Sequence, residues 1–223
     1  MRLKVIRSGS AGNTYLLMDD EKVLVLDAGV PSMEVKKALG FDISGICGVL
    51  ITHKHLDHAR YADEYAVAGI PVWKPYEGDL RQDRTFGHFR ARSVPMVHDV
   101  PCVGYLIECD DLKMLYATDT EYIRYRFKGL NALLIEANYS DALVDANAAK
   151  YKHVLTGHMS IDTAAGFIEA NKTALHTVVL CHLSNQGADP KGFVESVREI
   201  VPAGCAVHIA ESGAEIDLSE IPF

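Results

Sequence analysis

Short apolar runs separated by turn residues alternate with stretches of helical periodicity along most of the chain. The apolar runs predict β-strands, at residues 3–6, 14–18, 22–27, 46–52, 71–73, 86–97, 103–109, 112–118, 132–136, 177–182 and 206–210. The periodic stretches predict helices, at residues 31–39, 59–68, parts of 141–151, 161–171 and 190–200. Pro31 suits a first helical turn, and Gly40 and Gly69 are placed to end the first two helices. Strands with helices between them predict an α/β chain of two packed sheets with helices on the outer faces.

The length and composition of the chain are those expected of one folded unit. At 223 residues it can bury one sizeable core, and no Pro-rich or Ser-rich linker divides it, so we expect a single domain over 1–223. A membrane span needs about 18 consecutive apolar residues, and the sequence has no such run. The first eight residues lack the apolar core of a signal peptide. Five cysteines, an odd number without a Cys-x-x-Cys pair, favour reduced thiols in the cytoplasm.

One segment concentrates metal-ligand side chains directly after a predicted strand. The apolar run 48–51 is followed by three imidazoles and a carboxylate within six residues, in the sequence Thr52-His53-Lys54-His55-Leu56-Asp57-His58. In extended chain, alternation directs His53, His55 and Asp57 to one point, and His58 faces a second point nearby. A polar surface turn explains the segment less well, because neighbouring imidazoles repel when charged and gain little unless a metal binds them. Donors of this kind suit Zn²⁺, Mn²⁺ or Fe²⁺.

The His-x-His-x-Asp-His pattern at 53–58 resembles the signature of the metallo-β-lactamase superfamily. Further motifs follow at strand ends in the order that the superfamily has, and they contain His98, Asp119 and His182. The resemblance implies the αββα metallo-β-lactamase sandwich and a centre of two divalent cations at one edge of it. The implied ligands are His53, His55 and His98 for the first cation, Asp57, His58 and His182 for the second, and Asp119 bridging both. A water between two such cations loses a proton near neutral pH, and the resulting hydroxide is the implied nucleophile.

An earlier acid also matches the superfamily. Asp27 lies in the sequence Val25-Leu26-Asp27-Ala28-Gly29, which corresponds to the first motif. In the superfamily this acid usually supports the site by hydrogen bonding and does not bind the metal. The alternative is an ordinary turn acid in front of Gly29.

Three smaller features bear on the substrate. The loop 8–14 has the small residues of a backbone nest for anions, although an ordinary hairpin connection, taken alone, explains it better. His158 and Ser160 precede the helix predicted at 161–171, where a His and a Ser can bind phosphate. The alternative is that Ser160 only caps the helix. Asn138 follows the strand predicted at 132–136. The expected substrate-binding residues are Ser10, Asn13, Asn138, His158 and Ser160.

These features are similar to one subgroup of the superfamily, the compact bacterial exonucleases often labelled YycJ or WalJ. The chain has the subgroup's Ser-Gly-Ser-x-Gly-Asn opening at 8–13 and its His-Leu-Ser ending at 182–184. It departs from the subgroup at Tyr139, where the subgroup has His, and at Ile161, where it has Asn. The resemblance implies 5′→3′ exonuclease action on the phosphodiesters of DNA.

The same resemblance indicates which residues act in catalysis. Asp57 and Asp119 are the expected catalytic carboxylates. His158 is expected to contact a phosphate or to protonate the leaving group, for which it must reach the departing oxygen. Two other activities remain open: hydrolysis of small or cyclic phosphodiesters, and carbonyl hydrolysis of the lactonase, thioesterase or glyoxalase II kind. A metal-holding module without enzymatic activity is less expected, because the ligand set is complete.

The charge distribution gives mixed indications about a nucleic-acid partner. The formal net charge of −8 is opposite to the usual footprint of a DNA-binding protein. Basic residues nevertheless gather within 81–92 and within 124–128, and Tyr122, Tyr125 and Phe127 alternate with the second group. Such an arrangement can stack bases of a single strand, although a solvated basic face is the commoner explanation. The expected partner is therefore DNA or a small phosphodiester, with no membrane.

Overall fold

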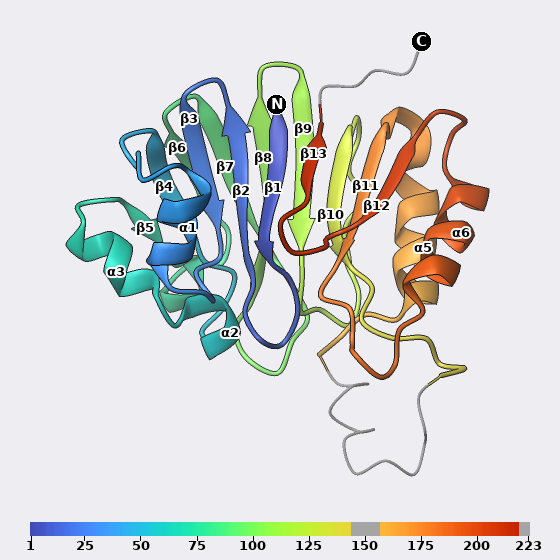
Figure 1. Ribbon diagram of the computed structural model, residues 1–223. Coiled ribbons are helices and arrows are strands. Elements are labelled where there is room, and N and C mark those ends of the chain that lie inside the picture. Colours follow the sequence, from blue (N-terminus) through green and yellow to red (C-terminus); the bar gives the residue numbers. More distant parts are fainter. Residues whose placement is uncertain (144–156, 219–223) are drawn as a thin grey trace.

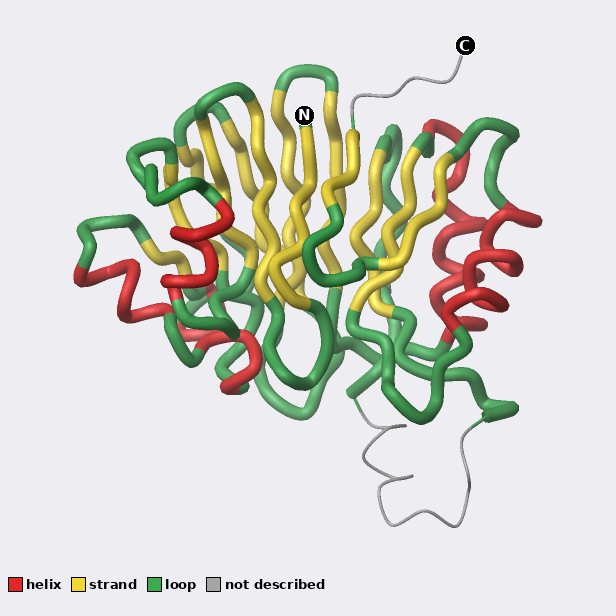
Figure 2. Tube along the Cα trace, in the orientation of Figure 1, coloured by secondary structure: helices red, strands yellow, loops and turns green. Residues whose placement is uncertain are grey.

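Two β-sheets lie face to face in this molecule, with helices on both outer sides (Figure 1). The computed structural model describes residues 1–143 and 157–218. Figure 2 shows the same layers, with the strands in the middle and the helices at the two flanks. The predicted arrangement of two packed sheets between outer helices is confirmed.

Within the described residues, the two sheets contain six and seven strands. In spatial order, the first sheet consists of β13 (Glu215–Asp217), β1 (Arg2–Arg7), β2 (Thr14–Asp19), β3 (Lys22–Leu26), β4 (Ile46–Leu50) and β5 (Val72–Trp73). The second consists of β12 (Ala206–Ile209), β11 (Thr177–Cys181), β10 (Ala132–Glu136), β9 (Leu112–Ala117), β8 (Val103–Cys109), β7 (Phe89–Pro95) and β6 (Asp83–Phe86).

Alternating side chains along the strands build the core between the sheets. In β2, Tyr15 and Leu17 belong to the cluster between the sheets, whereas Leu16 belongs to the cluster under the outer helices. Close packing of the two sheets requires a glycine in β4. A Cβ at Gly48 would lie 2.3 Å from the ring of Phe86, which comes from the opposite sheet.

Helices cover the outer face of each sheet. The helices on the first sheet are α1 (Ser32–Ala38), α2 (Leu56–Ala59) and α3 (Ala62–Val67), and those on the second are α5 (Ile161–Asn171) and α6 (Pro190–Ile200). Two 3₁₀ turns are η1 (Pro75–Glu77) and η2 (Lys172–Ala174). Val35 and Tyr65 pack from α1 and α3 into the first sheet, and Phe167 and Val197 pack from α5 and α6 into the second. Among the helices of the described residues, none is both long and apolar enough for a bilayer crossing.

Strands from both sheets end at the same edge of the sandwich, the lower edge in Figure 1. β3 and β4 run parallel, and so do β9, β10 and β11. β7 has the direction of β9 because both pair antiparallel with β8. The loops that follow these strands therefore gather at one edge, where rigid strands hold them in place.

Two predicted elements are wrong in detail. The single strand expected at 86–97 is a hairpin of β6 and β7 that turns at Gly87, whose φ is 60°. Apolar residues on both sides of this turn, Phe86 and Phe89, make the run look continuous in sequence. Of the helix expected at 59–68, residues 62–67 form α3, whereas Ala59 is the last residue of α2. The two helices are separated where the N–H of Tyr61 donates to the carbonyl of Ala28 at 2.9 Å.

One strand lies outside the predicted set. β13 is short and mostly polar, and only its pairing with β1, where Ile216 lies opposite Leu3, identifies it as a strand. Of the helix predicted within 141–151, residues 141–143 form a turn and residues 144–151 lie outside the described part of the chain.

Candidate metal centre

The loops at the lower edge bring seven histidine and aspartate side chains together, and we call them the His–Asp cluster. One set comprises His53, His55, His98 and Asp119, and the other comprises Asp57, His58, Asp119 and His182. Within each set, one nitrogen or oxygen atom from every residue lies within 4.8 Å of the others. Asp119 belongs to both sets, as a bridging carboxylate would. The two sets coincide with the ligand sets that the resemblance implies.

Every member of the cluster follows the end of a strand. His53 and His55 come after β4, His98 after β7, Asp119 after β9 and His182 after β11, and Asp57 and His58 lie in α2. Asp119 and His182 have positive φ angles of 50° and 52°. Residues other than glycine are strained in this left-handed conformation, which persists where the surroundings hold it and is common at functional sites.

Extended chain does not continue through the 53–58 motif. Helix α2 begins at Leu56, with His55 as its N-cap residue. Asp57 is therefore turned away from His53 and His55 and joins the set of His58. The convergence of His53, His55 and Asp57 predicted from alternation is wrong, because it assumed that the strand conformation extends to residue 57.

The distances within the cluster match those between ligands of one metal ion. Oδ2 of Asp119 lies 3.5 Å from Nε2 of His53 and 3.4 Å from Nε2 of His58. Oδ2 of Asp57 lies 3.4 Å from Nε2 of His58 and 3.6 Å from Nε2 of His182. Ligand atoms about 2.0–2.1 Å from a tetrahedral zinc ion are about 3.3–3.4 Å apart. The side chains therefore have room for cations between them without rearrangement of the backbone.

Two buried nitrogens in the cluster have no hydrogen-bond partner. They are Nε2 of His53 and Nε2 of His182, whose residues are 0% and 2% exposed. A buried polar atom without a partner is costly, so native structures rarely keep one without a role. Metal coordination would satisfy both nitrogens. Because these nitrogens have no other partner, the residues present fit divalent cations.

The outer nitrogens of two imidazoles are held by the protein. Nδ1 of His98 donates to the carbonyl of Gly157 at 2.8 Å. Nδ1 of His58 donates to Oδ2 of Asp27 at 2.7 Å. A proton on Nδ1 leaves Nε2 with a free lone pair, and in each residue Nε2 is the atom that faces Asp119.

Asp27 is buried behind the cluster. Its Oδ1 accepts a hydrogen bond from the backbone N–H of Thr52 at 2.8 Å, and its Oδ2 accepts one from the hydroxyl of Tyr116 at 2.5 Å. Asp27 belongs to neither ligand set, and with its bond to His58 it lies where the resemblance expects a supporting acid.

The family model described as Metallo-beta-lactamase superfamily matches residues 7–184. The chain belongs to this superfamily. A solved structure of the same fold, the metallo-beta-lactamase fold protein YhfI from Bacillus subtilis, superposes with a TM-score of 0.74 at 18% sequence identity. The superposition covers 96% of this chain and 98% of YhfI. The predicted metallo-β-lactamase sandwich is therefore confirmed.

Two curated relatives are similar in sequence to this superfamily member. The exodeoxyribonuclease YycJ of Bacillus anthracis is 28% identical over 167 residues, which are 62% of this chain and 63% of YycJ. The match thus spans less than two thirds of that relative. The exodeoxyribonuclease WalJ of Streptococcus pneumoniae is 26% identical over 222 residues, which are 83% of this chain and 82% of WalJ. The predicted similarity to the YycJ/WalJ subgroup of the superfamily is confirmed.

Burial and charge act differently on the two ligand sets of this metallo-β-lactamase fold. Burial lowers the pKa of His53 well below its usual value and also lowers the pKa of His98. These imidazoles are therefore neutral, as metal binding requires. Burial acts the same way on His58 and His182, but the surrounding carboxylates, Asp119 first among them, together outweigh it. They raise the pKa of His58 well above its usual value and that of His182 to about 10. The carboxylates of the second set thus require a balancing positive charge, which a dication supplies as well as protons do.

Glu136 is a site residue that the sequence reasoning did not select. It is fully buried at the end of β10, and its Oε1 accepts a hydrogen bond from Nδ1 of His158 at 2.7 Å. The ring of His158 stacks on that of His182, with centroids 5.3 Å apart and planes 13° apart. Burial favours a neutral His158, but the hydrogen bond and charge of Glu136 raise the pKa of its imidazole. The sequence feature that could have indicated Glu136 is a glutamate at the end of an otherwise apolar strand.

Of the predicted substrate-binding residues, Asn13 and Asn138 lie beneath the cluster. The amide of Asn13 closes the 8–14 loop through two hydrogen bonds with Gly9 and lies 2.9 Å from Nε2 of His58. The amide nitrogen of Asn138 donates to the carbonyl of His182 at 2.7 Å. Both residues are at most 5% exposed, and both amides hold neighbouring parts of the site in position. A substrate contact by Asn13 or Asn138 stays a prediction.

The predicted serines differ from each other in position. The hydroxyl of Ser160 caps α5 by accepting a hydrogen bond from the N–H of Thr163 at 3.2 Å. The capping alternative is thus confirmed, and a substrate contact of Ser160 stays a prediction. Ser10 is exposed in the 8–14 loop, so its role in substrate binding also stays a prediction.

Proposed function

We propose that this protein is a metal-dependent phosphodiesterase that acts on DNA as a 5′→3′ exonuclease. The observation that carries the proposal is the His–Asp cluster, in which buried imidazole nitrogens without hydrogen-bond partners surround a shared carboxylate. The names of two relatives, both exodeoxyribonucleases, support DNA as the substrate class. All five cysteines are free thiols, which supports a reducing compartment such as the cytoplasm.

The proposed cofactor is a pair of divalent cations, either Zn²⁺ or Mn²⁺, with Fe²⁺ as a further candidate. When bound, two such cations lower the pKa of water and offset the charge that builds up on an attacked phosphoryl group. The proposed ligands are His53, His55 and His98 for one cation, Asp57, His58 and His182 for the other, and Asp119 for both. Asp57 and Asp119 are the proposed catalytic carboxylates, because they would hold the cations next to the reacting group, Asp57 one of them and Asp119 both.

The protein holds these ligands in position before a substrate arrives. The carbonyl of Gly157 and the carboxylate of Asp27 fix the rings of His98 and His58 through their outer nitrogens. The amide of Asn138 holds the backbone of His182. Preset ligands need little reorganisation during the reaction, which is the main electrostatic advantage of an enzyme site over water.

His158 is proposed to protonate the leaving oxygen. Its side chain is 13% exposed and its ring stacks on that of His182, so part of the ring is open to solvent beside the cluster. Glu136 holds the opposite side of the ring and stabilises its charged form. A general acid in this position matters most when the leaving group is a poor one, such as the sugar alkoxide of DNA.

A panel of substrates tests the proposed function. Purified protein loaded with Mn²⁺ or Zn²⁺ is given 5′-phosphorylated single-stranded and duplex DNA, bis-(p-nitrophenyl) phosphate, a lactone and a thioester. We expect shortening of DNA from its 5′ end, and no turnover by Asp119→Ala. Cleavage of the small diester without DNA would favour the small-phosphodiester alternative, which the net charge of −8 also favours. Cleavage of the lactone or thioester alone would favour a carbonyl hydrolase.

The role of His158 has a separate test. His158→Ala should keep the metal content and lower kcat on DNA by about 10²–10⁴-fold, the usual contribution of a general acid. Hydrolysis of bis-(p-nitrophenyl) phosphate should fall much less, because p-nitrophenolate leaves without protonation. Equal losses on both substrates would exclude the acid role, and loss of metal would make His158 a ligand instead.

A further inference from the structure

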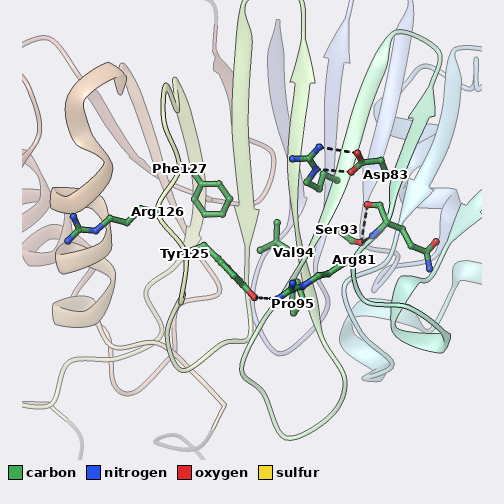
Figure 3. A pocket seen from close by; sticks show the side chains of 10 residues that line it. Arg81, Asp83, Ser93, Val94, Pro95, Tyr125, Arg126 and Phe127 are labelled. Carbon is green, nitrogen blue, oxygen red and sulfur yellow. Dashed lines mark hydrogen bonds and ion pairs between the residues drawn. The ribbon is translucent and has the colours of Figure 1, made fainter.

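A pocket of about 550 Å³ lies between two segments that are about thirty to forty-five residues apart in sequence (Figure 3). We call it the Tyr125 pocket. Val94 and Pro95 of β7 line one part of it, and Tyr125 and Phe127 line another. Arg81, which is exposed, stands at its rim, whereas the side chain of Arg126 extends away from Tyr125 and Phe127 (Figure 3). The volume is within the range of about 300–1,000 Å³ that holds small molecules in proteins.

The aromatic side of the pocket is fixed in place. The ring centroids of Tyr125 and Phe127 are 6.5 Å apart, and that of Phe127 lies 6.3 Å from the ring of Phe167 in α5. Both rings are half-buried, whereas Arg124, Arg126 and Lys128, which alternate with them, are exposed. The alternation seen in the sequence therefore places aromatic rings on the protein side and basic side chains on the solvent side of one segment.

The two basic stretches of the sequence meet at this pocket. Nη2 of Arg81 donates to the hydroxyl of Tyr125, the dashed contact in Figure 3, at 3.2 Å. The guanidinium carbon lies 6.0 Å from the centre of that ring. Arg92 is paired instead with Asp83 at 2.8 Å, and Arg84 lies over the ring of Trp73. Of the first stretch, Arg81 is thus the residue directed to the aromatic segment.

The pocket is continuous with the loops of the His–Asp cluster. Val97, two residues after Pro95, donates to the hydroxyl of Thr120 at 3.0 Å and accepts from the N–H of Glu121 at 2.8 Å. These bonds join the loop that carries His98 to the loop that carries Asp119. Each of the two loops leads from a cluster residue to one wall of the pocket.

We propose that the Tyr125 pocket binds one nucleotide of a single-stranded DNA substrate, at a position away from the scissile phosphodiester. The base stacks on the ring of Tyr125, and Arg81 contacts a flanking phosphate. A π-face accepts any base, so the subsite adds affinity without sequence preference. The local positive charge at the rim also explains how a chain of net charge −8 binds a polyanion. This inference rests on the proposed function.

Binding of a hydrolysis-resistant oligonucleotide tests the subsite. The probe is a 5′-phosphorylated single-stranded phosphorothioate 12-mer with fluorescein at its 3′ end, followed by fluorescence anisotropy on the metal-loaded protein. Tyr125→Ala should weaken binding about tenfold or more, and Tyr125→Phe should stay within about twofold, because it keeps the ring. Arg81→Gln should lower the slope of log Kd against log salt by about one unit. The matched control, Arg198→Gln, removes an exposed charge from α6. This helix packs beside β12, at the opposite end of the second sheet from β6 and β7, so the substitution should change neither the affinity nor the salt slope.

An abasic scan locates the stacked base. Replacing the bases of the 12-mer one at a time by an abasic linker should weaken binding to the wild type at one position. That loss should vanish in Tyr125→Ala, since the ring and the base act as a pair. Turnover of bis-(p-nitrophenyl) phosphate should stay at the wild-type rate in all variants, which shows an intact metal site and fold.

Two results would overturn the inference, and they are distinguishable. If the wild type degrades DNA and Tyr125→Ala binds the 12-mer as tightly, the subsite is refuted and the proposed function stands. If the wild type cleaves the small diester but neither binds nor degrades DNA, the proposed function and the subsite fail together.

Discussion

The carboxylate of Asp27 connects three parts of the molecule at the level of single atoms. It accepts hydrogen bonds from the backbone of Thr52, from the ring of His58 and from the hydroxyl of Tyr116 in the other sheet. The residue is fully buried and has a φ of 57°, so its surroundings hold a strained backbone in place. Such a residue affects metal binding only through the ligand it orients.

Substitutions at Asp27 and Asp119 should separate orientation from coordination. Asp27→Ala should weaken metal binding by about tenfold, at the low end of what outer hydrogen-bond partners contribute, and leave measurable activity. Asp119→Ala should abolish turnover, because it removes the carboxylate shared by both ligand sets. Metal content by mass spectrometry and hydrolysis of bis-(p-nitrophenyl) phosphate are the measurements, and Asp111→Ala, an exposed turn residue, is the control. Small and equal effects at Asp27 and Asp119 would refute this division of roles.

Gly157 supports His98 through its backbone alone. Its carbonyl accepts from Nδ1 of His98, its φ is 94°, and a Cβ there would lie 2.5 Å from that nitrogen. Gly157→Ala should therefore displace the ring and lower occupancy of the first metal site together with activity. Gly166→Ala is the matched control, because a Cβ at that position in α5 meets no atom within 4 Å. Normal metal content in Gly157→Ala would show that the ring does not depend on this carbonyl.

At the level of elements, α5 begins beside the cluster, and its cap is a single hydroxyl. Ser160 accepts from the N–H of Thr163 and is 5% exposed. Ser160→Ala should lower the free energy of unfolding by about 1 kcal/mol, the usual contribution of such a cap, and Ser160→Thr should restore most of it. Urea unfolding measures this effect. If Ser160 instead contacts substrate, KM for DNA will rise in Ser160→Ala without a matching loss of stability.

Elements with a strong local pattern could be predicted from the sequence, and those decided by tertiary contacts could not. The strands β3, β9 and β11 are buried apolar runs, so their ends, and with them the positions of Asp119 and His182, follow from sequence. The start of α2 at Leu56 redirects Asp57, and no residue before it signals that start. Glu136 was overlooked because its importance comes from a partner, His158, that is distant in sequence.

At the level of the whole molecule, the His–Asp cluster joins the two sheets. His53 and His55 follow a strand of the first sheet, whereas His98, Asp119 and His182 follow strands of the second. A cation bound by residues from both sheets stabilises the folded state, since the unfolded chain does not hold these ligands together. The core between the sheets is apolar and extensive, so the fold itself does not depend on the metal.

Metal removal should therefore lower stability without unfolding the protein. Treatment with a chelator should reduce Tm, and Mn²⁺ or Zn²⁺ at about 100 times its Kd should restore about 2.7 kcal/mol at a single site. The far-ultraviolet circular dichroism should stay the same throughout, because the strands keep their own core. Asp119→Ala provides the control, since its Tm should respond little to either treatment. An unchanged Tm in the wild type after complete metal removal, verified by mass spectrometry, would show that the cluster does not join the sheets through a bound ion.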